Sequence, residues 1–410
     1  MLSPLAMYMA LVKAIIGAGV LAMPYAMLRA GLIPSMLLLA LICMATVHTT
    51  LQLLRSALAL DFTLSPLLTP TSRSLCQSST SCPEAESDVI TYMQLSQVTF
   101  GVQTGRYVTW SCLVPAQFVT GTSYIIFVSQ NTASALGGQP TGLVLLASIV
   151  ISMAICTPRT MDYLAVPSTL GNASFLVAIL CVIIYAVGVY GVHEENVNLW
   201  GSWGGFCEAF GVLCLTFSAQ SESLSILSSA SAESRKNLTS IVVAAMGTTL
   251  VVFSLYSYLV LAAFGSNTQM IVFDNLPKRS CIVAVVRLAM SFMLQCSYPL
   301  ALFPMFHIME TTYVDAHSTW SRLASRWTVV LGTATSAYLF MDYFEPIAAI
   351  VGGLMSTNAF MLPPLFYHKL KVGVITEWDR WTCRLWVLLG FFGSVSSILG
   401  GLNSIFNNVR

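Results

Sequence analysis

The residues best placed to do chemistry stand close together near the start of the chain: Lys13, the glycine pair Gly17 and Gly19, and Pro24. They interrupt an apolar stretch long enough to cross a membrane, where a lysine costs about 2.5–3.5 kcal/mol. The glycines and the proline weaken the helical hydrogen bonds at a depth where lipid offers no replacement partners. Such a helix is expected to be broken and to line a polar site, as the interrupted helices of secondary transporters do.

Unwinding at the glycine pair would free backbone amide groups beside a positive half-helix end. That environment suits a carboxylate, such as the α-carboxylate of an amino acid. The pattern therefore predicts substrate binding at Ile16, Gly17, Ala18 and Gly19. The alternative interpretation of the glycines is a close packing face between two helices.

Lys13 precedes Gly17 by one helical turn, so the two positions share a helix face. A fixed ammonium there can take the place of a bound metal cation, or it can bind and release a proton. Alternatively, its stem extends back to the membrane surface. We predict an ion-coupling role for Lys13.

A second polar run lies in the sixth membrane-length segment, over residues 216–225. Its hydroxyl groups can satisfy an unwound backbone, and Glu222 is its only carboxylate. Glu222 is expected to carry a proton or to pair with a substrate amino group, unless it only marks the cytosolic mouth. Ser218, Gln220 and Glu222 are the predicted substrate-binding residues of this segment.

The eighth membrane-length segment carries Gln295 and Ser297 just before Pro299. Their side-chain oxygens are of the kind that hold a hard cation, so both are predicted to contribute to ion coupling, with H⁺ or Na⁺ as the coupling ion. The histidines and cysteines show no metal-ligand spacing, and no paired-carboxylate or nucleophile motif is present. No cofactor, no metal site and no enzyme activity are predicted.

The composition indicates an integral membrane protein. Hydrophobic residues make up 56% and charged residues 9%, against about 45–50% and about 25% in soluble proteins. So few charges cannot cover a soluble surface of this size, and the net charge of +1 argues against nucleic acid as a partner. The expected partners are the lipid bilayer and an amino-acid substrate, with no obligate protein partner.

The sequence predicts an all-α polytopic membrane protein that forms a single transmembrane domain over residues 1–410. Segments long enough to cross about 30 Å of hydrocarbon give about eleven spans. The fourth and ninth are the shortest or most polar. The predicted spans are 5–28, 32–56, 106–129, 141–157, 163–190, 203–228, 238–264, 281–306, 326–342, 345–367 and 383–407.

The distribution of Lys and Arg predicts a cytosolic N-terminus. Twelve of these residues then lie in cytosolic segments and four outside, with Lys13 and Arg287 within spans. The longest loop, residues 57–105, is cytosolic in this topology. Its Ser- and Pro-rich part, residues 65–90, is expected to be disordered.

The interrupted first and sixth spans would each be the first span of a five-span half, and the two halves cover about 5–190 and 203–367. That arrangement is typical of inverted-repeat transporters, with the segment 383–407 as an accessory helix. No sequence identity links the two halves.

Three segments resemble the amino acid/auxin permease superfamily, especially its sodium-coupled neutral amino-acid transporters of the system A/N type. They are residues 14–26 with the Ala30-Gly31 pair, residues 219–238, and residues 286–304, which end in Ser297-Tyr-Pro-Leu-Ala-Leu-Phe-Pro304. The resemblance implies a LeuT-type fold of eleven helices with five-plus-five inverted repeats and discontinuous helices 1 and 6. It also implies symport of amino acids by alternating access.

The chain departs from the sodium-coupled pattern in two places. An asparagine precedes the glycine-broken motif in those members, whereas this chain has Lys13 there, as the proton-coupled members do. The paired glutamates late in the sixth span are replaced by Ser228 and Ser229. The expected function is therefore secondary active amino-acid transport that is proton-coupled or sodium-independent. The alternatives are sodium-coupled neutral symport and a non-transporting amino-acid sensor. The expected location is the plasma membrane or a vacuolar or lysosomal membrane.

Overall fold

The computed structural model describes most of the chain as helix, and the only strand-like pairing in the described residues is an isolated bridge between Leu2 and Ala230. Ala18, one of the predicted site residues, and the segment 65–90 lie outside the described residues. The described residues are 2–17, 19–64, 91–138, 141–158, 165–193, 195, 197–277, 280–313, 318–370 and 376–409.

The first half of the chain supplies five long helical rods and one short helix. The first rod consists of two short helices, and the fifth ends in a π-helical turn. The elements are α1 (Pro4–Ile15), α2 (Gly19–Ala30), α3 (Leu32–Leu64), α5 (Tyr92–Phe100), α6 (Val102–Ala135), α7 (Thr141–Ile155), α8 (Ala165–Tyr185) and η2 (Ala186–Tyr190).

The second half contains six rods with short helices between them. The elements are α9 (Trp203–Phe217), α10 (Gln220–Ser228), α11 (Ala232–Lys236), α12 (Leu238–Phe264), η4 (Gly265–Asn267), η5 (Val272–Asn275), α13 (Cys281–Tyr313), α14 (Thr319–Leu339), η6 (Met341–Tyr343), α15 (Phe344–Ser356), η7 (Thr357–Met361), α16 (Leu362–Leu370) and α17 (Glu377–Val409).

Both predicted helix interruptions are present. α1 ends where Ile16 turns extended, and α2 continues from Gly19 at an angle of 54°. α9 ends at Phe217, and α10 begins at Gln220 after a break at Ser218 and Ala219. The breaks fall at the glycine pair and at the start of the Ser-rich run, where the sequence weakens the helical hydrogen bonds or offers hydroxyl substitutes for them.

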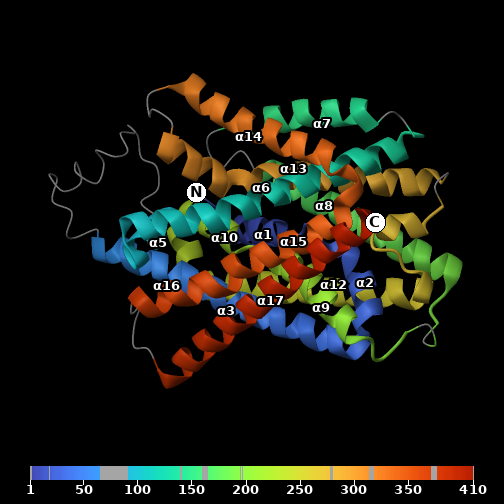
Figure 1. The fold of residues 1–410 in the computed structure, drawn as a ribbon, viewed down its shortest axis with the longest axis horizontal. Coiled ribbons are helices and arrows are strands. Elements are labelled where there is room, and N and C mark those ends of the chain that lie inside the picture. The colour runs from blue at the N-terminus through green and yellow to red at the C-terminus, as the bar shows by residue number, and fades with distance from the viewer. Residues whose placement is uncertain are drawn as a thin grey trace.

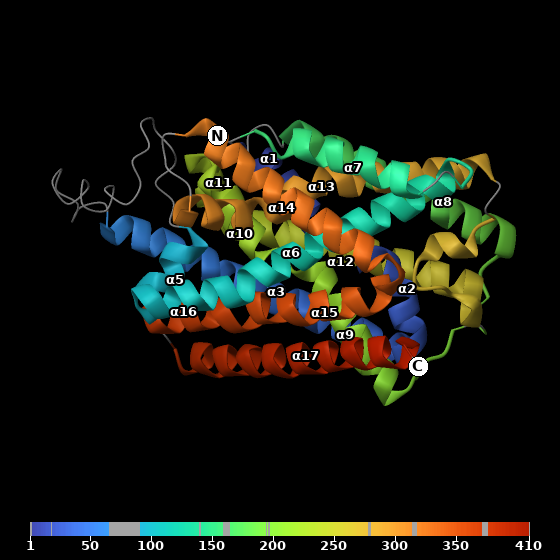
Figure 2. The same cartoon turned by 45° about the horizontal axis from the view of Figure 1, so that its top comes forward.

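The long rods run side by side along the longest axis of the molecule (Figure 1). The broken pairs α1/α2 and α9/α10 lie in the interior, where α2 packs on α9, and α1 contacts α8, α10, α12 and α13. Figure 2 shows α7 and α14 on one side of the bundle and α16 with α17 on the other. α6 and α13 pack on each other and pass close to both breaks. We call the end at which α1 begins the N-terminal end of the bundle.

Not all of these rods are long and apolar enough to cross a membrane by themselves. Within the described residues, seven helices are, and the bent pair α1/α2 makes an eighth span. The other rods are α7, with 15 residues, α14, and the α15–η7–α16 segment that a π-helical turn divides. The fourth and ninth predicted spans, the shortest or most polar in the sequence, correspond to α7 and α14.

Helix boundaries correct part of the predicted cytosolic loop. The sequence predicts a loop over residues 57–105, but α3 continues to Leu64, and α5 and the start of α6 occupy Tyr92–Phe100 and the residues from Val102. α5 begins with a capping box, in which Thr91 and Gln94 satisfy each other's backbone amide groups. Hydropathy identifies apolar spans but not helices that continue past them, such as the end of α3, or short helices between them, such as α5. The last helix also begins earlier than the predicted 383, at Glu377.

Two buried arginines tie helices together near the two ends of the bundle. Arg287 on α13 donates to Asn131 Oδ1 on α6 at 2.9 Å and to Phe273 O on η5 at 2.8 Å. It also pairs with Asp274 at 3.1 Å. Near the N-terminal end, Arg326 on α14 pairs with Glu310 on α13 and donates to the carbonyls of Cys156 and Pro158 after α7.

Candidate functional site

A cavity opens where the two broken helices meet α6 and α13. Its volume is about 20 Å³, which is room for about one water molecule. Polar groups at its wall come from both broken helices, from α6 and from α13. The lining residues are Lys13, Ala14, Ile15, Gly17, Thr120, Tyr124, Leu215, Ser218, Glu222, Ser297, Leu300, Ala301 and Met355.

Lys13 is almost fully buried, with 1% of its surface exposed, so its stem does not extend to the membrane surface. Its Nζ donates a hydrogen bond of 2.9 Å to the backbone oxygen of Met293 on α13. The Ser297 hydroxyl donates to the same oxygen at 3.1 Å. The predicted ion-coupling residues Lys13 and Ser297 are therefore brought together on one carbonyl group.

Gly171 on α8 makes room for the lysine. A Cβ atom added at Gly171 would lie 2.6 Å from Lys13 Nζ and 2.9 Å from its Cε, and 3.4 Å from the Cβ of Cys296. Any larger residue at this position would displace the end of the lysine side chain. The ammonium group thus sits between α1, α8 and α13.

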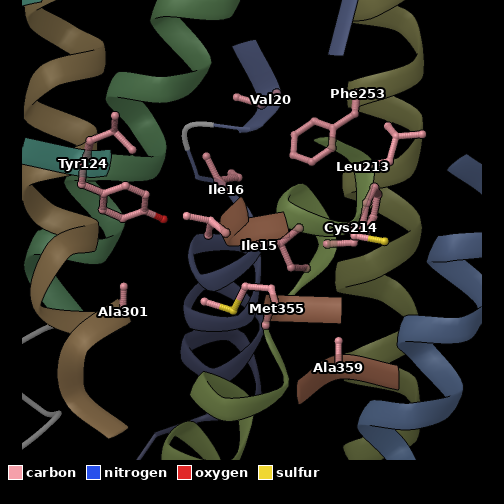
Figure 3. Close-up of a cluster of buried hydrophobic side chains, with 14 of the residues drawn as sticks. Ile15, Ile16, Val20, Tyr124, Leu213, Cys214, Phe253, Ala301, Met355 and Ala359 are labelled. Atoms are coloured by element: carbon pink, nitrogen blue, oxygen red, sulfur yellow. The ribbon is translucent and has the colours of Figure 1, made fainter. Parts of the chain in front are cut away.

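The glycine pair has two distinct roles in the packing. A Cβ at Gly17 would lie 2.8 Å from the hydroxyl oxygen of Tyr124, so the tyrosine reaches the break itself. Figure 3 shows its ring extending from α6 toward Ile15 and Ile16. A Cβ at Gly19 would instead meet Thr216, 2.5 Å from Oγ1 and 3.3 Å from Cα, so Gly19 allows α2 to approach α9.

Glu222 reaches the cavity from the first turn of α10, and its carboxylate is held in place by neutral donors. Gln117 Nε2 on α6 donates to its Oε1 at 3.0 Å and to the Ser221 hydroxyl at 2.9 Å. The Ser221 hydroxyl donates to Oε2 at 2.9 Å. A carboxylate in the first helical turn also gains from the helix dipole. Glu222 is 4% exposed and Gln117 is fully buried.

The remaining predicted residues divide between the cavity and its surroundings. Ser218 lies at the cavity wall, and its hydroxyl donates to the Cys214 carbonyl at 2.5 Å. Ile16 is buried in the apolar cluster of Figure 3, beside the cavity-lining Ile15. Ala18 lies outside the described residues.

Two predicted glutamines are not among the residues that line the cavity. Gln220 donates to Thr49 on α3 at 3.3 Å, and Gln295 donates to the Ser152 hydroxyl on α7 at 2.7 Å. Each stands two positions from a cavity residue, Glu222 and Ser297. Two residues apart on a helix are separated by about 200°, so their side chains face opposite directions.

Sequence reasoning placed the third predicted span beside the substrate but selected no individual residue of α6. Gln117, Thr120 and Tyr124 stand at positions i, i+3 and i+7, which places them on one helix face. Thr120 and Tyr124 line the cavity, and Gln117 donates a hydrogen bond to the Glu222 carboxylate. A row of polar side chains along one face of an otherwise apolar span is the signal that points to them.

Comparison with known proteins agrees with this architecture. The family model described as "Transmembrane amino acid transporter protein" matches residues 2–405. The chain is 24% identical to Amino acid transporter AVT3C of Arabidopsis thaliana, over 96% of this chain and 89% of that protein. It is 23% identical to Vacuolar amino acid transporter 4 of Saccharomyces cerevisiae, over 73% and 48%. It is 24% identical to human Solute carrier family 38 member 8, over 62% and 61%.

Solved structures show the fold. MhsT in complex with L-phenylalanine superimposes with a TM-score of 0.59 at 13% identity, covering 98% of both chains. The inward-facing conformation of Mhp1 gives 0.56 at 11% identity, over 98% and 91%. The expected all-helical, LeuT-type architecture is confirmed, as is the expectation of a transporter rather than an enzyme. The chain belongs to the transmembrane amino acid transporter family.

Proposed function

We propose that this amino-acid transporter works by alternating access at the cavity between the broken helices, and that its transport is proton-coupled or sodium-independent. The observation that carries the proposal is the position of Lys13. Its ammonium nitrogen and the Ser297 hydroxyl both bond to the Met293 carbonyl, at 2.9 and 3.1 Å.

A carbonyl and a hydroxyl beside a helix break are oxygen ligands of the type that hold a sodium ion. Here, the lysine nitrogen lies where such an ion would be coordinated. Two positive charges about 4 Å apart repel each other by several kcal/mol even at an effective dielectric constant of 20. A charged Lys13 thus substitutes for sodium and excludes it, and loss of its proton would remove that charge.

The substrate is proposed to lie between the two breaks. Its carboxylate would accept hydrogen bonds from amide groups freed around Gly17 and from the Tyr124 hydroxyl, which lies beside that glycine. Its α-amino group would face the last carbonyls of α9 and the Ser218 hydroxyl oxygen, at the negative end of that half-helix. The proposed inverted halves, residues 5–190 and 203–367, would move against each other around this site.

Similarity to yeast proteins named vacuolar amino acid transporters supports a vacuolar or lysosomal membrane, with the plasma membrane as the second candidate. The proposed orientation keeps the N-terminus in the cytosol, in agreement with the distribution of basic residues.

The test is amino-acid uptake into proteoliposomes under an imposed proton or sodium gradient, for the unaltered protein and for Lys13→Asn. We expect uptake that a proton gradient stimulates or that needs no ion gradient, and that becomes dependent on sodium, or falls about tenfold, in Lys13→Asn. Lys236→Asn, an exposed position on α11, is the matched control and should leave uptake unchanged.

Two outcomes would contradict the proposal. Sodium-driven uptake that is the same in Lys13→Asn would indicate a sodium symporter in which Lys13 has only a structural role. Binding of an amino acid without uptake under any gradient would instead indicate a sensor built on the transporter fold.

A further inference from the structure

Glu222 remains to be explained, because the proposed contacts of a zwitterionic amino acid do not use its charge. Its carboxylate lines the cavity, yet both described side-chain donors to it, Gln117 and Ser221, are neutral. In the described part of the chain, no Lys, Arg or His nitrogen lies within 4.0 Å of this carboxylate. Lys13 lines the same cavity, but its ammonium group bonds to Met293.

A buried carboxylate without a cation is costly. Neutral hydrogen bonds and the helix dipole offset only part of the lost hydration, and an uncompensated buried charge costs several kcal/mol. A carboxylate can accept about four hydrogen bonds, so Glu222 has room for a further donor beyond Gln117 and Ser221. Glu222 is therefore positioned to receive a cation from the cavity.

The position of Glu222 relative to the helix breaks indicates which cation this is. Gln117, which bonds to Glu222, precedes Tyr124 by seven residues on α6, roughly 10 Å along the helix axis. Tyr124 marks the level of Gly17, where the substrate carboxylate is proposed to bind. The α-amino group is proposed to face Ser218 and the last carbonyls of α9, so Glu222 is left for a second cationic group of the substrate. A terminal ammonium or guanidinium group at the end of a long side chain is such a group.

Part of the cavity lining lies on the side of the helix breaks toward the N-terminal end of the bundle. Thr120 lies one turn before Tyr124 on α6, and Ala301 lies one turn after Ser297 on the antiparallel α13, so both line the cavity toward the N-terminal end of the bundle. Leu300 adds an apolar wall at the same level. Leu300 and Ala301 thus offer apolar surface to the methylene chain of a basic side chain whose terminal cation pairs with Glu222.

We propose that Glu222 makes this site selective for basic amino acids, with Gln117 and Ser221 as positioning residues that orient its carboxylate. The proposal rests on the proposed function, since it names the substrate class of the same cavity. It differs from a role of Glu222 in binding the α-amino group or in carrying protons, because those roles would affect every amino acid equally.

The experiment measures uptake and equilibrium binding of radiolabelled lysine and alanine by purified protein in proteoliposomes. The variants are Glu222→Gln, which keeps the size and hydrogen-bonding capacity of the side chain, and Gln117→Lys, which places a competing cation beside Glu222. Glu233→Gln, an exposed carboxylate on α11, is the matched control.

We expect lysine binding to weaken by about tenfold or more in Glu222→Gln and in Gln117→Lys, since bonds to charged groups are the stronger ones. Alanine binding should change by less than about threefold in both variants, which also serves as evidence that they fold. Glu233→Gln should resemble the unaltered protein for both substrates.

Three outcomes would overturn the inference. Equal losses for lysine and alanine in Glu222→Gln would assign the carboxylate to a group that all amino acids share. Unchanged lysine binding would show that the carboxylate does not contact the substrate. Transport of alanine but not lysine by the unaltered protein would refute the selectivity while leaving the proposed function intact, whereas failure to transport any amino acid would refute the proposed function itself.

Discussion

At the scale of single residues, the position of Lys13 depends on what faces it from α8. The lysine is held by one carbonyl of α13, and the space for its terminal atoms exists because residue 171 has no side chain. Since Gly171 is not among the residues that line the cavity, a small change at position 171 acts on the ammonium group without touching the substrate.

Gly171→Ala is predicted to move the ammonium group off the Met293 carbonyl. The added Cβ would lie 2.6 Å from Nζ, and the flexible end of the lysine can shift to avoid it. We expect the free energy of unfolding to fall by only about 1–3 kcal/mol, the value of one buried hydrogen bond to a charged group. The ion dependence of uptake should change as in Lys13→Asn.

Gly247→Ala on α12 is the control, because nothing lies within 4 Å of the place that its added Cβ would occupy. Thermal unfolding in detergent measures stability, and gradient-driven uptake measures coupling. An unchanged ion dependence in Gly171→Ala would show that the contact between Lys13 and Met293 does not govern coupling.

At the scale of elements, the site depends on how closely α2 and α9 cross. Gly19 stands at the start of α2, and a Cβ there would meet both the hydroxyl and the backbone of Thr216. Backbone cannot move aside as a flexible side chain can, so the two half-helices would have to separate.

Gly19→Ala is therefore predicted to destabilise the protein by about 1–3 kcal/mol, the usual cost of overpacking, and to abolish most uptake. Gly204→Ala, at an open position near the start of α9, should be neutral or slightly stabilising because alanine favours helix. The comparison of melting temperatures in detergent, together with uptake, tests this. If Gly19→Ala keeps full uptake, the crossing does not need the close approach.

The sequence predicted the breaks because their causes are local. Glycines near Pro24 and hydroxyl groups after Phe217 indicate lost helical hydrogen bonds. Four residues selected on this basis, Lys13, Gly17, Ser218 and Glu222, line one cavity together with Ser297. Gln220 and Gln295 were included because their side chains carry oxygen atoms in the same polar runs, but helical rotation directs them to Thr49 and Ser152. Gln117, Tyr124 and Gly171 could not be found in this way, since their roles come from helices that meet only in the folded bundle.

At the scale of the whole molecule, η5 is tied to the bundle by Arg287. This side chain is 4% exposed and bonds to α6 and to η5, with its guanidinium 5.9 Å from the Phe273 ring centroid. η5 also contacts α2. Through its bond to η5, Arg287 therefore connects α13 and α6 to a segment that packs on one of the broken helices.

Arg287→Ala is predicted to lower stability by about 1–3 kcal/mol for each buried acceptor left unsatisfied, at Asn131 and Phe273. Arg380→Ala, which removes an exposed pair with Glu377, should cost about 1 kcal/mol or less. Melting temperatures in detergent separate the two. Equal small shifts would mean that Arg287 does not hold η5 in place.

The contact between Lys13 and Gly171 also limits how this transporter can diverge over time. A lysine at position 13 tolerates only glycine at position 171 without moving, whereas a shorter residue at position 13 would leave room for a side chain there. The two positions are far apart in sequence, but the residue at one limits which residues are tolerated at the other. Exchange of the ammonium group for a smaller polar residue therefore removes the constraint on α8, and reversal to lysine first requires that glycine be restored.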